Sequence, residues 1–95
     1  MIKNIQRASR FKRDFKSYKR KHFNMALLKK ILVLIIQGNQ SKLSRHYHDH
    51  ALHGNWQGYR ELHVDNRNDI LLVYKVVDDY YLGLARLNTH NKIFG

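Results

Sequence analysis

The chain has 95 residues, of which 43% are apolar and none is cysteine, and its formal net charge is +11. This length and composition predict one compact domain over residues 1–95 and exclude a disordered chain, a disulfide scaffold and a thiolate metal site. The charge is unevenly distributed. Residues 1–47 carry thirteen Lys and Arg but only one acidic residue, Asp14, whereas residues 48–95 carry five Lys and Arg and six acidic residues. The positive electrostatic potential of the first half attracts a polyanion, first of all nucleic acid, or an acidic protein partner. Because the chain has neither the apolar core of a signal peptide nor an apolar run long enough to span a bilayer, we expect a cytoplasmic protein without a membrane partner.

The first half of the chain predicts one short strand and two helices. Residues 1–9 are typical of a strand with Ile2 and Ile5 facing inward, and Ser9 is expected to cap the first helix. Apolar residues then recur at helical spacing, at Phe11, Phe15 and Tyr18.

A second helix is expected to begin after Asn24, a suitable N-cap, and to end before Gly38. It carries an apolar series of Leu27, Leu28, Ile31, Leu32, Ile35 and Ile36. The following stretch, residues 39–58, is polar and without a sustained period, so it is interpreted as a long loop, a type of segment that often carries function.

From Gly58 onward the apolar period becomes two. "YRELHV", "DILLVYKVV" and "YYLGLARL" predict three strands, with "NRN" and "DD" as the turns between them. Ile93 and Phe94 suggest that the short tail docks on the protein. The predicted fold class is therefore α+β, in the order β-α-α-β-β-β, with an antiparallel sheet and two helices packed on one face.

Histidine is concentrated in one segment, since five of the seven histidines fall between His46 and His63. An extended backbone would place His46, His48 and His50 on one side, with Asp49 and His53 close by, and imidazole suits zinc, nickel or copper. The segment nevertheless lacks a second cluster at ligand spacing, so no metal site and no cofactor are predicted. A solvated histidine-rich loop is the alternative.

Acid–base chemistry is the other interpretation of these histidines. Cleavage of RNA without a metal needs a base for the 2′-OH, an acid for the leaving 5′-oxygen and cations around the phosphate. Four candidates fall at strand ends or loops on one rim of the predicted sheet: His50, His63, Asp69 and His90. In an antiparallel meander, His63 and Asp69 would be neighbours across the turn, and Arg86 could bring a guanidinium to a phosphate.

The cations of the first helix are denser than solubility alone requires. We expect an RNA-binding surface made of Lys12, Arg13, Lys16, Lys19 and Arg60. The alternative is a solvated helix face. Trp56 and Tyr59 could stack on bases, although packing beside Gly54 and Gly58 is the more usual role of such aromatics.

The segments "DHALHGNWQGYRELHVD", "DILLVYK" and "RLNTHNKIFG" closely resemble the YafQ-type toxins of the RelE/ParE superfamily, and the resemblance covers the entire chain. It implies a β-α-α-β-β-β microbial RNase-like fold. It also implies a metal-independent endoribonuclease that cuts mRNA on the ribosome and is neutralised by an antitoxin protein in a type II toxin–antitoxin pair. By motif match, the catalytic residues would be His50, His63, Asp69, Arg86, His90 and Phe94. The chain departs from the family's pattern at Ile70, where one member has Trp, and in the longer turn 65–69.

Three rival functions remain open at this stage. A ParE-type relative would poison DNA gyrase, but it would not need histidines at positions 50, 63 and 90 together. An RNA-binding module could dock without cutting. A metal-dependent hydrolase would lose its activity in EDTA.

Overall fold

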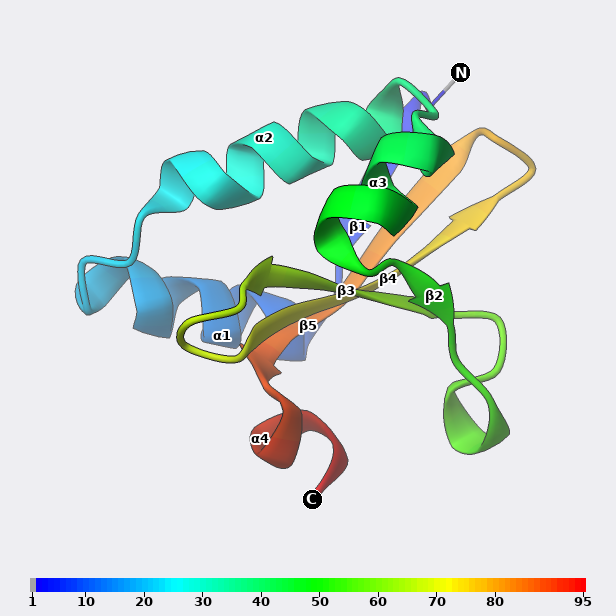
Figure 1. Ribbon diagram of the computed structural model, residues 1–95. Helices are drawn as coiled ribbons and strands as arrows, with labels where there is room; N and C mark the ends of the chain where they lie inside the picture. The colour runs from blue at the N-terminus through cyan, green and yellow to red at the C-terminus, as the bar shows by residue number, and fades with distance from the viewer. Residues whose placement is uncertain (1) are drawn as a thin grey trace.

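The computed structural model describes residues 2–95 as a five-stranded sheet with helices on both faces (Figure 1). The sheet order is β1-β5-β4-β3-β2, in which β1 pairs parallel with β5 and all other neighbours pair antiparallel. The elements are β1 (Asn4–Arg7), α1 (Ser9–Arg20), α2 (Met25–Ile36), α3 (Gln40–Tyr47), β2 (His50–Ala51), the 3₁₀-helix η1 (Gly54–Trp56), β3 (Arg60–Asp65), β4 (Ile70–Val77), β5 (Tyr81–Thr89) and α4 (His90–Phe94). The α+β class and the meander of the last three long strands are thus confirmed.

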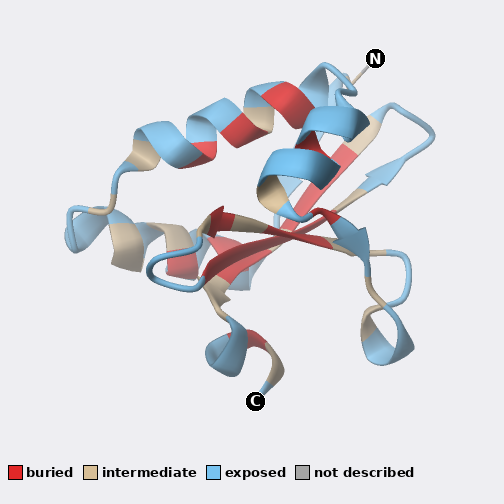
Figure 2. Cartoon of the chain, in the orientation of Figure 1, coloured by how far each residue is buried: buried red, intermediate tan, exposed pale blue. Residues whose placement is uncertain are grey.

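The main core lies between the sheet and the first three helices. Each helix turns its apolar stripe toward the strands, as the buried positions in Figure 2 show. The buried helix residues are Phe11, Leu28, Ile31, Leu34, Ile35 and Leu43, and they pack with leucines, valine, isoleucine and Tyr74 of β3, β4 and β5.

The opposite face of the sheet has a smaller core. Successive strand residues point to opposite faces, so Leu71 and Val73 pack away from the first three helices. Ile93 of α4 completes this buried cluster, and Phe94 packs beside it. The predicted docking of the tail is confirmed. The expected two helices on one face are α1 and α2; α3, which was not expected, joins them, whereas α4 lies on the other face.

Two details of the N-terminal region differ from the expectation. Ile5 is 50% exposed, because β1 is a short strand at the edge of the sheet. The first helix begins at Ser9, with Ala8 rather than Ser9 at the N-cap and no side-chain cap. Asn24 does cap α2, accepting a hydrogen bond from the Ala26 N–H at 3.1 Å, and Gly38 follows the helix with a φ of +70°.

The predicted long loop 39–58 was wrong, since it contains α3, β2 and η1. Helix α3 is held by one buried residue, Leu43, and by an N-cap in which the Asn39 side chain accepts from the Lys42 N–H. A single apolar anchor produces no hydrophobic period, so the helix left no pattern in the sequence. Among the described residues, no helix is long and apolar enough to cross a membrane.

Candidate active site

Asp69 and His90 meet at one end of the sheet, although 21 positions separate them in the sequence. Asp69 precedes β4, and its Oδ2 accepts a hydrogen bond from the backbone N–H of His90 at 3.2 Å. His90 is the first residue of α4, and both side chains are exposed. The contact fixes the start of α4 and leaves the His90 imidazole facing solvent, where it can reach a substrate.

His63 lies on β3, opposite Leu71 of β4. It is therefore on the face of the sheet that α4 covers, the same face as Val73. Its imidazole packs edge-on against that of His48, with ring centroids 5.4 Å apart. The expected direct neighbour of His63 was Asp69, but the turn 65–69 and a shift in register after His63 place Leu71 opposite it instead.

His50 is oriented by a hydrogen bond to the backbone and lies beside a buried glutamate. Its Nδ1 lies 2.7 Å from the His48 carbonyl oxygen, which can only accept, so Nδ1 carries the proton. Its Nε2 lies 3.6 Å from Oε1 of Glu61, a buried carboxylate that β3 places opposite β2. In the neutral ring, Nε2 then carries the lone pair, on the side of the Glu61 carboxyl group. Glu61 was missed by sequence analysis, although its spacing of two from His63 places both residues on one face of β3.

The metal interpretation of this segment depended on an extended backbone from His46 to His50. The structure contradicts it, because His46 lies in α3 and His48 is the left-handed C-cap of that helix. Within residues 2–95, no group of three or more His, Cys, Asp or Glu is placed to hold a metal ion. His46 and His53 are both exposed to solvent.

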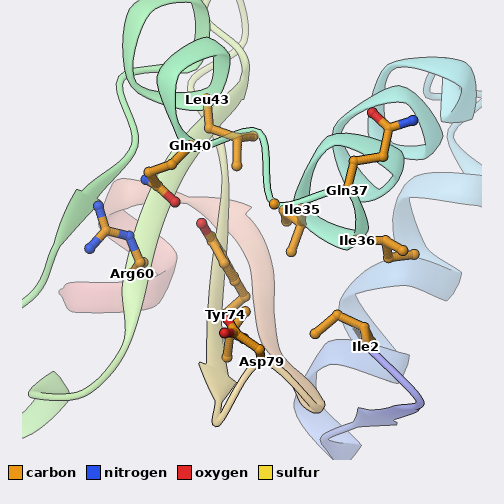
Figure 3. A pocket seen from close by; sticks show the side chains of 11 residues that line it. Ile2, Ile35, Ile36, Gln37, Gln40, Leu43, Arg60, Tyr74 and Asp79 are labelled. Atoms are coloured by element: carbon orange, nitrogen blue, oxygen red, sulfur yellow. The ribbon is translucent and has the colours of Figure 1, made fainter.

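Asp49, which directly precedes His50, is the centre of a buried polar cluster. Its carboxylate accepts hydrogen bonds from Arg60 Nε at 2.6 Å, from Gln40 Nε2 at 3.1 Å and from the Tyr74 hydroxyl. Burial and this hydrogen bond to Asp49 raise the pKa of Tyr74 above its ordinary value. The cluster borders a cavity of about 520 Å³ near the ends of α2 and α3, where Figure 3 shows Gln40, Arg60 and Tyr74 turned toward one another. It ties the segment before His50 to β3 and β4.

Arg86 is buried on β5 and paired with Asp14 of α1. The guanidinium donates through Nε at 2.8 Å and through Nη2 at 3.3 Å. The same carboxylate accepts from the Leu87 N–H and from the Asn88 side chain, both at 3.0 Å. Although burial opposes ionisation, these hydrogen bonds hold the pKa of Asp14 below its ordinary value. Sequence analysis did not anticipate this pair, whose members are 72 positions apart.

Aromatic rings support the C-terminal helix. The Phe94 ring lies 5.0 Å from the His90 imidazole and 5.8 Å from the Trp56 ring, and Trp56 also contacts Tyr59 at 5.3 Å, all between centroids. Trp56 and Tyr59 are half-buried and pack on the smaller core. Packing is thus the role the structure gives them.

The cations of α1 divide between two flanks. Lys12, Lys16 and Lys19 are exposed and share one flank of the helix. Arg13 lies on the side of Asp14, where it lines a hollow with Arg10 and Arg86. Arg60 is separate from all of them, in the cluster around Asp49.

Comparisons with known proteins show the family to which the chain belongs. Residues 3–95 match the family model described as "Bacterial toxin of type II toxin-antitoxin system, YafQ". The chain is 36% identical to the mRNA interferase toxin YafQ of Escherichia coli strain K12 over 93 residues, which is 98% of this chain and 97% of that protein.

Solved structures show the same fold. The crystal structure of YafQ from E. coli strain BL21(DE3) superposes with a TM-score of 0.84 at 34% identity, covering 98% of this chain and 99% of that one. YafQ in the E. coli DinJ–YafQ complex gives 0.82 at 35% identity, with the same coverage. A copper-bound mutant toxin from Helicobacter pylori gives 0.85 at 31% identity, covering 99% of this chain and all of that one. With its family model matched over nearly its full length, the chain belongs to the YafQ family of bacterial type II toxin–antitoxin toxins.

Proposed function

We propose that residues 1–95 form one toxin domain that acts in the cytoplasm as an mRNA interferase, an endoribonuclease that cuts mRNA on the ribosome. Curated relatives that share 36% of the sequence are mRNA interferase toxins, and the E. coli relative is known in complex with the protein DinJ. The chain accordingly has a cognate antitoxin as its protein partner.

The contact between Asp69 and His90 carries the mechanistic part of this proposal, because it holds the Asp69 carboxylate beside the backbone of the histidine that we assign as the acid. In the proposed reaction the 2′-oxygen attacks the adjacent phosphorus while the bond to the 5′-oxygen breaks. His90 gives its proton to the leaving 5′-oxygen, and Asp69 or His63 takes the proton from the 2′-OH. The products are a 2′,3′-cyclic phosphate and a 5′-hydroxyl.

The other residues assigned to catalysis support these proton transfers. His50, backed by Glu61, is a further acceptor on the same face of the sheet as His63. Arg86 offers the guanidinium N–H groups that Asp14 leaves free to the charged phosphate. Phe94 packs against the His90 ring and limits its rotation.

Single-turnover cleavage of ribosome-bound mRNA tests the chemistry. His90→Ala and Asp69→Ala should lower the cleavage rate about 10²–10⁴-fold while ribosome binding changes little, as expected for lost proton-transfer groups. His46→Ala, an exposed histidine outside the rim, is the matched control. Cleavage by His90→Ala within a few-fold of the unmodified protein, or fragments that end in a 3′-hydroxyl, would overturn the mechanism.

The exposed cations of α1 are proposed to contact ribosomal RNA phosphates. Neutralising Lys12, Arg13, Lys16 and Lys19 should weaken ribosome binding and reduce its salt dependence by about 0.7–0.9 log units per lost contact. An unchanged salt slope would place the RNA-binding surface elsewhere. Arg60 is not part of this set, because its Nε is bound to Asp49.

The antitoxin is proposed to hide the rim by charge pairing and burial. An acidic or amphipathic segment would complement the basic half of the chain. Hydrogen exchange of the free toxin and of the complex should show protection between His46 and His63 or in α4. If neither region gains protection, the antitoxin does not mask the site directly.

A further inference from the structure

A cationic hollow lies beside the candidate active site, between α1, β5 and α4. It measures about 250 Å³, and its lining side chains are Arg10, Arg13, Asp14, Arg86 and Lys92. Four cations and one carboxylate leave it with a net charge of +3. Asp14 and Arg86 are buried and form its base, whereas the other three are exposed around it.

The charge of this hollow is not balanced within the protein. Asp14 is bound to Arg86, its only ion-pair partner in the described chain. Arg10, Arg13 and Lys92 take part in none of the three ion pairs found among residues 2–95. Three cations around a concave surface repel one another, so the arrangement is most stable when an anion lies among them.

The position of the hollow indicates which anion it accepts. Lys92 belongs to the same short helix as His90, and its backbone N–H donates to Thr89 Oγ1 at 3.3 Å, which fixes the first turn. Arg86, which the proposed mechanism assigns to the reacting phosphate, lines the same hollow, so the hollow adjoins the site of cleavage. Arginine and lysine side chains grouped in this way bind phosphate oxygens.

We propose that Arg10 and Lys92 bind the backbone phosphate of the mRNA next to the one that is cleaved. The inference rests on the proposed function and extends it, because it assigns a binding subsite for the substrate outside the acid–base residues. Held at this second point, the RNA strand cannot slide past His90, and the reacting phosphate is positioned for attack.

The test compares Arg10→Gln/Lys92→Gln with Lys29→Gln/Lys30→Gln, a double substitution that removes the same charge from exposed positions of α2. The measured quantity is the affinity of toxin-bound ribosomes for an mRNA made uncleavable by a 2′-deoxy nucleotide at the cut site. The first variant should lose about 10- to 100-fold, the range expected for two charge-assisted contacts, and the control should lose little. With cleavable mRNA, the same loss should appear in KM.

A neutral methylphosphonate linkage next to the cut site gives the second arm. It should weaken binding of the mRNA to the unmodified toxin but not to Arg10→Gln/Lys92→Gln, which already lacks the contact. Equal sensitivity in both proteins would overturn the proposal, as would equal behaviour of the two double variants. If Arg10→Gln/Lys92→Gln lost affinity for ribosomes that carry no mRNA, the two cations would be assigned to ribosomal RNA, and the proposal would be overturned as well. If the unmodified toxin bound the uncleavable mRNA but never cut the cleavable one, the proposed function would fail while the phosphate subsite stood.

Discussion

Arg60 donates its Nε to the buried carboxylate of Asp49 at 2.6 Å and so joins β3 to the segment that leads into His50. An arginine that sequence analysis assigned to RNA binding therefore has a partner inside the protein. The Arg60 side chain is still one-third exposed, so a substitution can separate a role in stability from a role in RNA binding.

We predict that Arg60→Gln lowers the free energy of unfolding by about 1–3 kcal/mol, because it leaves a buried carboxylate short of a donor. The salt slope of ribosome binding should not change. Arg67→Gln, at an exposed position in the turn between β3 and β4, is the control and should be neutral in stability. A reduced salt slope with unchanged stability would restore the RNA-binding role of Arg60.

Tyr74 makes the stability of the protein sensitive to alkaline pH. Burial, with the neighbouring Asp49, raises the pKa of Tyr74, whereas a tyrosine in the unfolded chain has a pKa of about 10. Below that pH both states are protonated and the stabilisation is complete. Above it the unfolded state loses its proton first, so the free energy of unfolding should fall as the pH rises.

Urea denaturation between about pH 8 and 11 measures this effect. Tyr74→Phe should be less stable at neutral pH and should show a shallower alkaline decline. Tyr80→Phe, which alters a tyrosine that is 52% exposed, should retain the full decline. An identical decline in Tyr74→Phe would show that other groups cause it.

Asp69 combines a backbone role with a chemical one, and two substitutions separate them. Its φ of +54° lies in the left-handed region, which asparagine adopts more readily than alanine. Asp69→Asn keeps an acceptor for the His90 N–H but loses the negative charge. We expect it to retain the stability and the amide protection of His90 and to lose most of its cleavage activity. Asp69→Ala should lose the amide protection of His90 and stability as well as cleavage activity. Near-normal cleavage by Asp69→Asn would assign the role of the base to His63.

The contact between Phe94 and Trp56 provides a spectroscopic reporter, because Trp56 is the only tryptophan in the chain. Phe94→Ala should lower the free energy of unfolding by about 1–2 kcal/mol, since a half-buried ring is removed. It should also shift the tryptophan emission to longer wavelength as solvent reaches the indole. Phe94→Leu, which keeps apolar contact, should shift it less. Unchanged emission in both variants would mean that α4 does not shield Trp56.

The long elements could be predicted because each leaves a periodic pattern of its own. Phe11 and Tyr18 mark α1, Asn24 and Gly38 mark the ends of α2, and alternation or apolar runs mark β3, β4 and β5. Helix α3 could not be predicted, because Leu43 is its only buried residue. Ile5 was misjudged because alternation identifies a strand without showing whether another element covers it.

Candidate site residues could be proposed from the sequence, but the contacts that they make could not. A pair such as Asp14 and Arg86 depends on how α1 crosses β5, which no local pattern records. The same is true of Asp49 with Tyr74, and of the Asp69 carboxylate that meets the backbone of His90 rather than the ring of His63. These contacts follow from tertiary packing.

The Asp14 carboxylate has a further consequence, for solubility. Strand β1 pairs with β5 only as far as Leu84, so the rest of β5 would present unpaired backbone groups to any passing strand. The Leu87 N–H instead donates a hydrogen bond to the Asp14 carboxylate. A second copy of the chain therefore finds no free donor at that position. Helix α1, which carries Asp14 and packs on β5, blocks intermolecular β-pairing there, the usual start of aggregation from exposed strands.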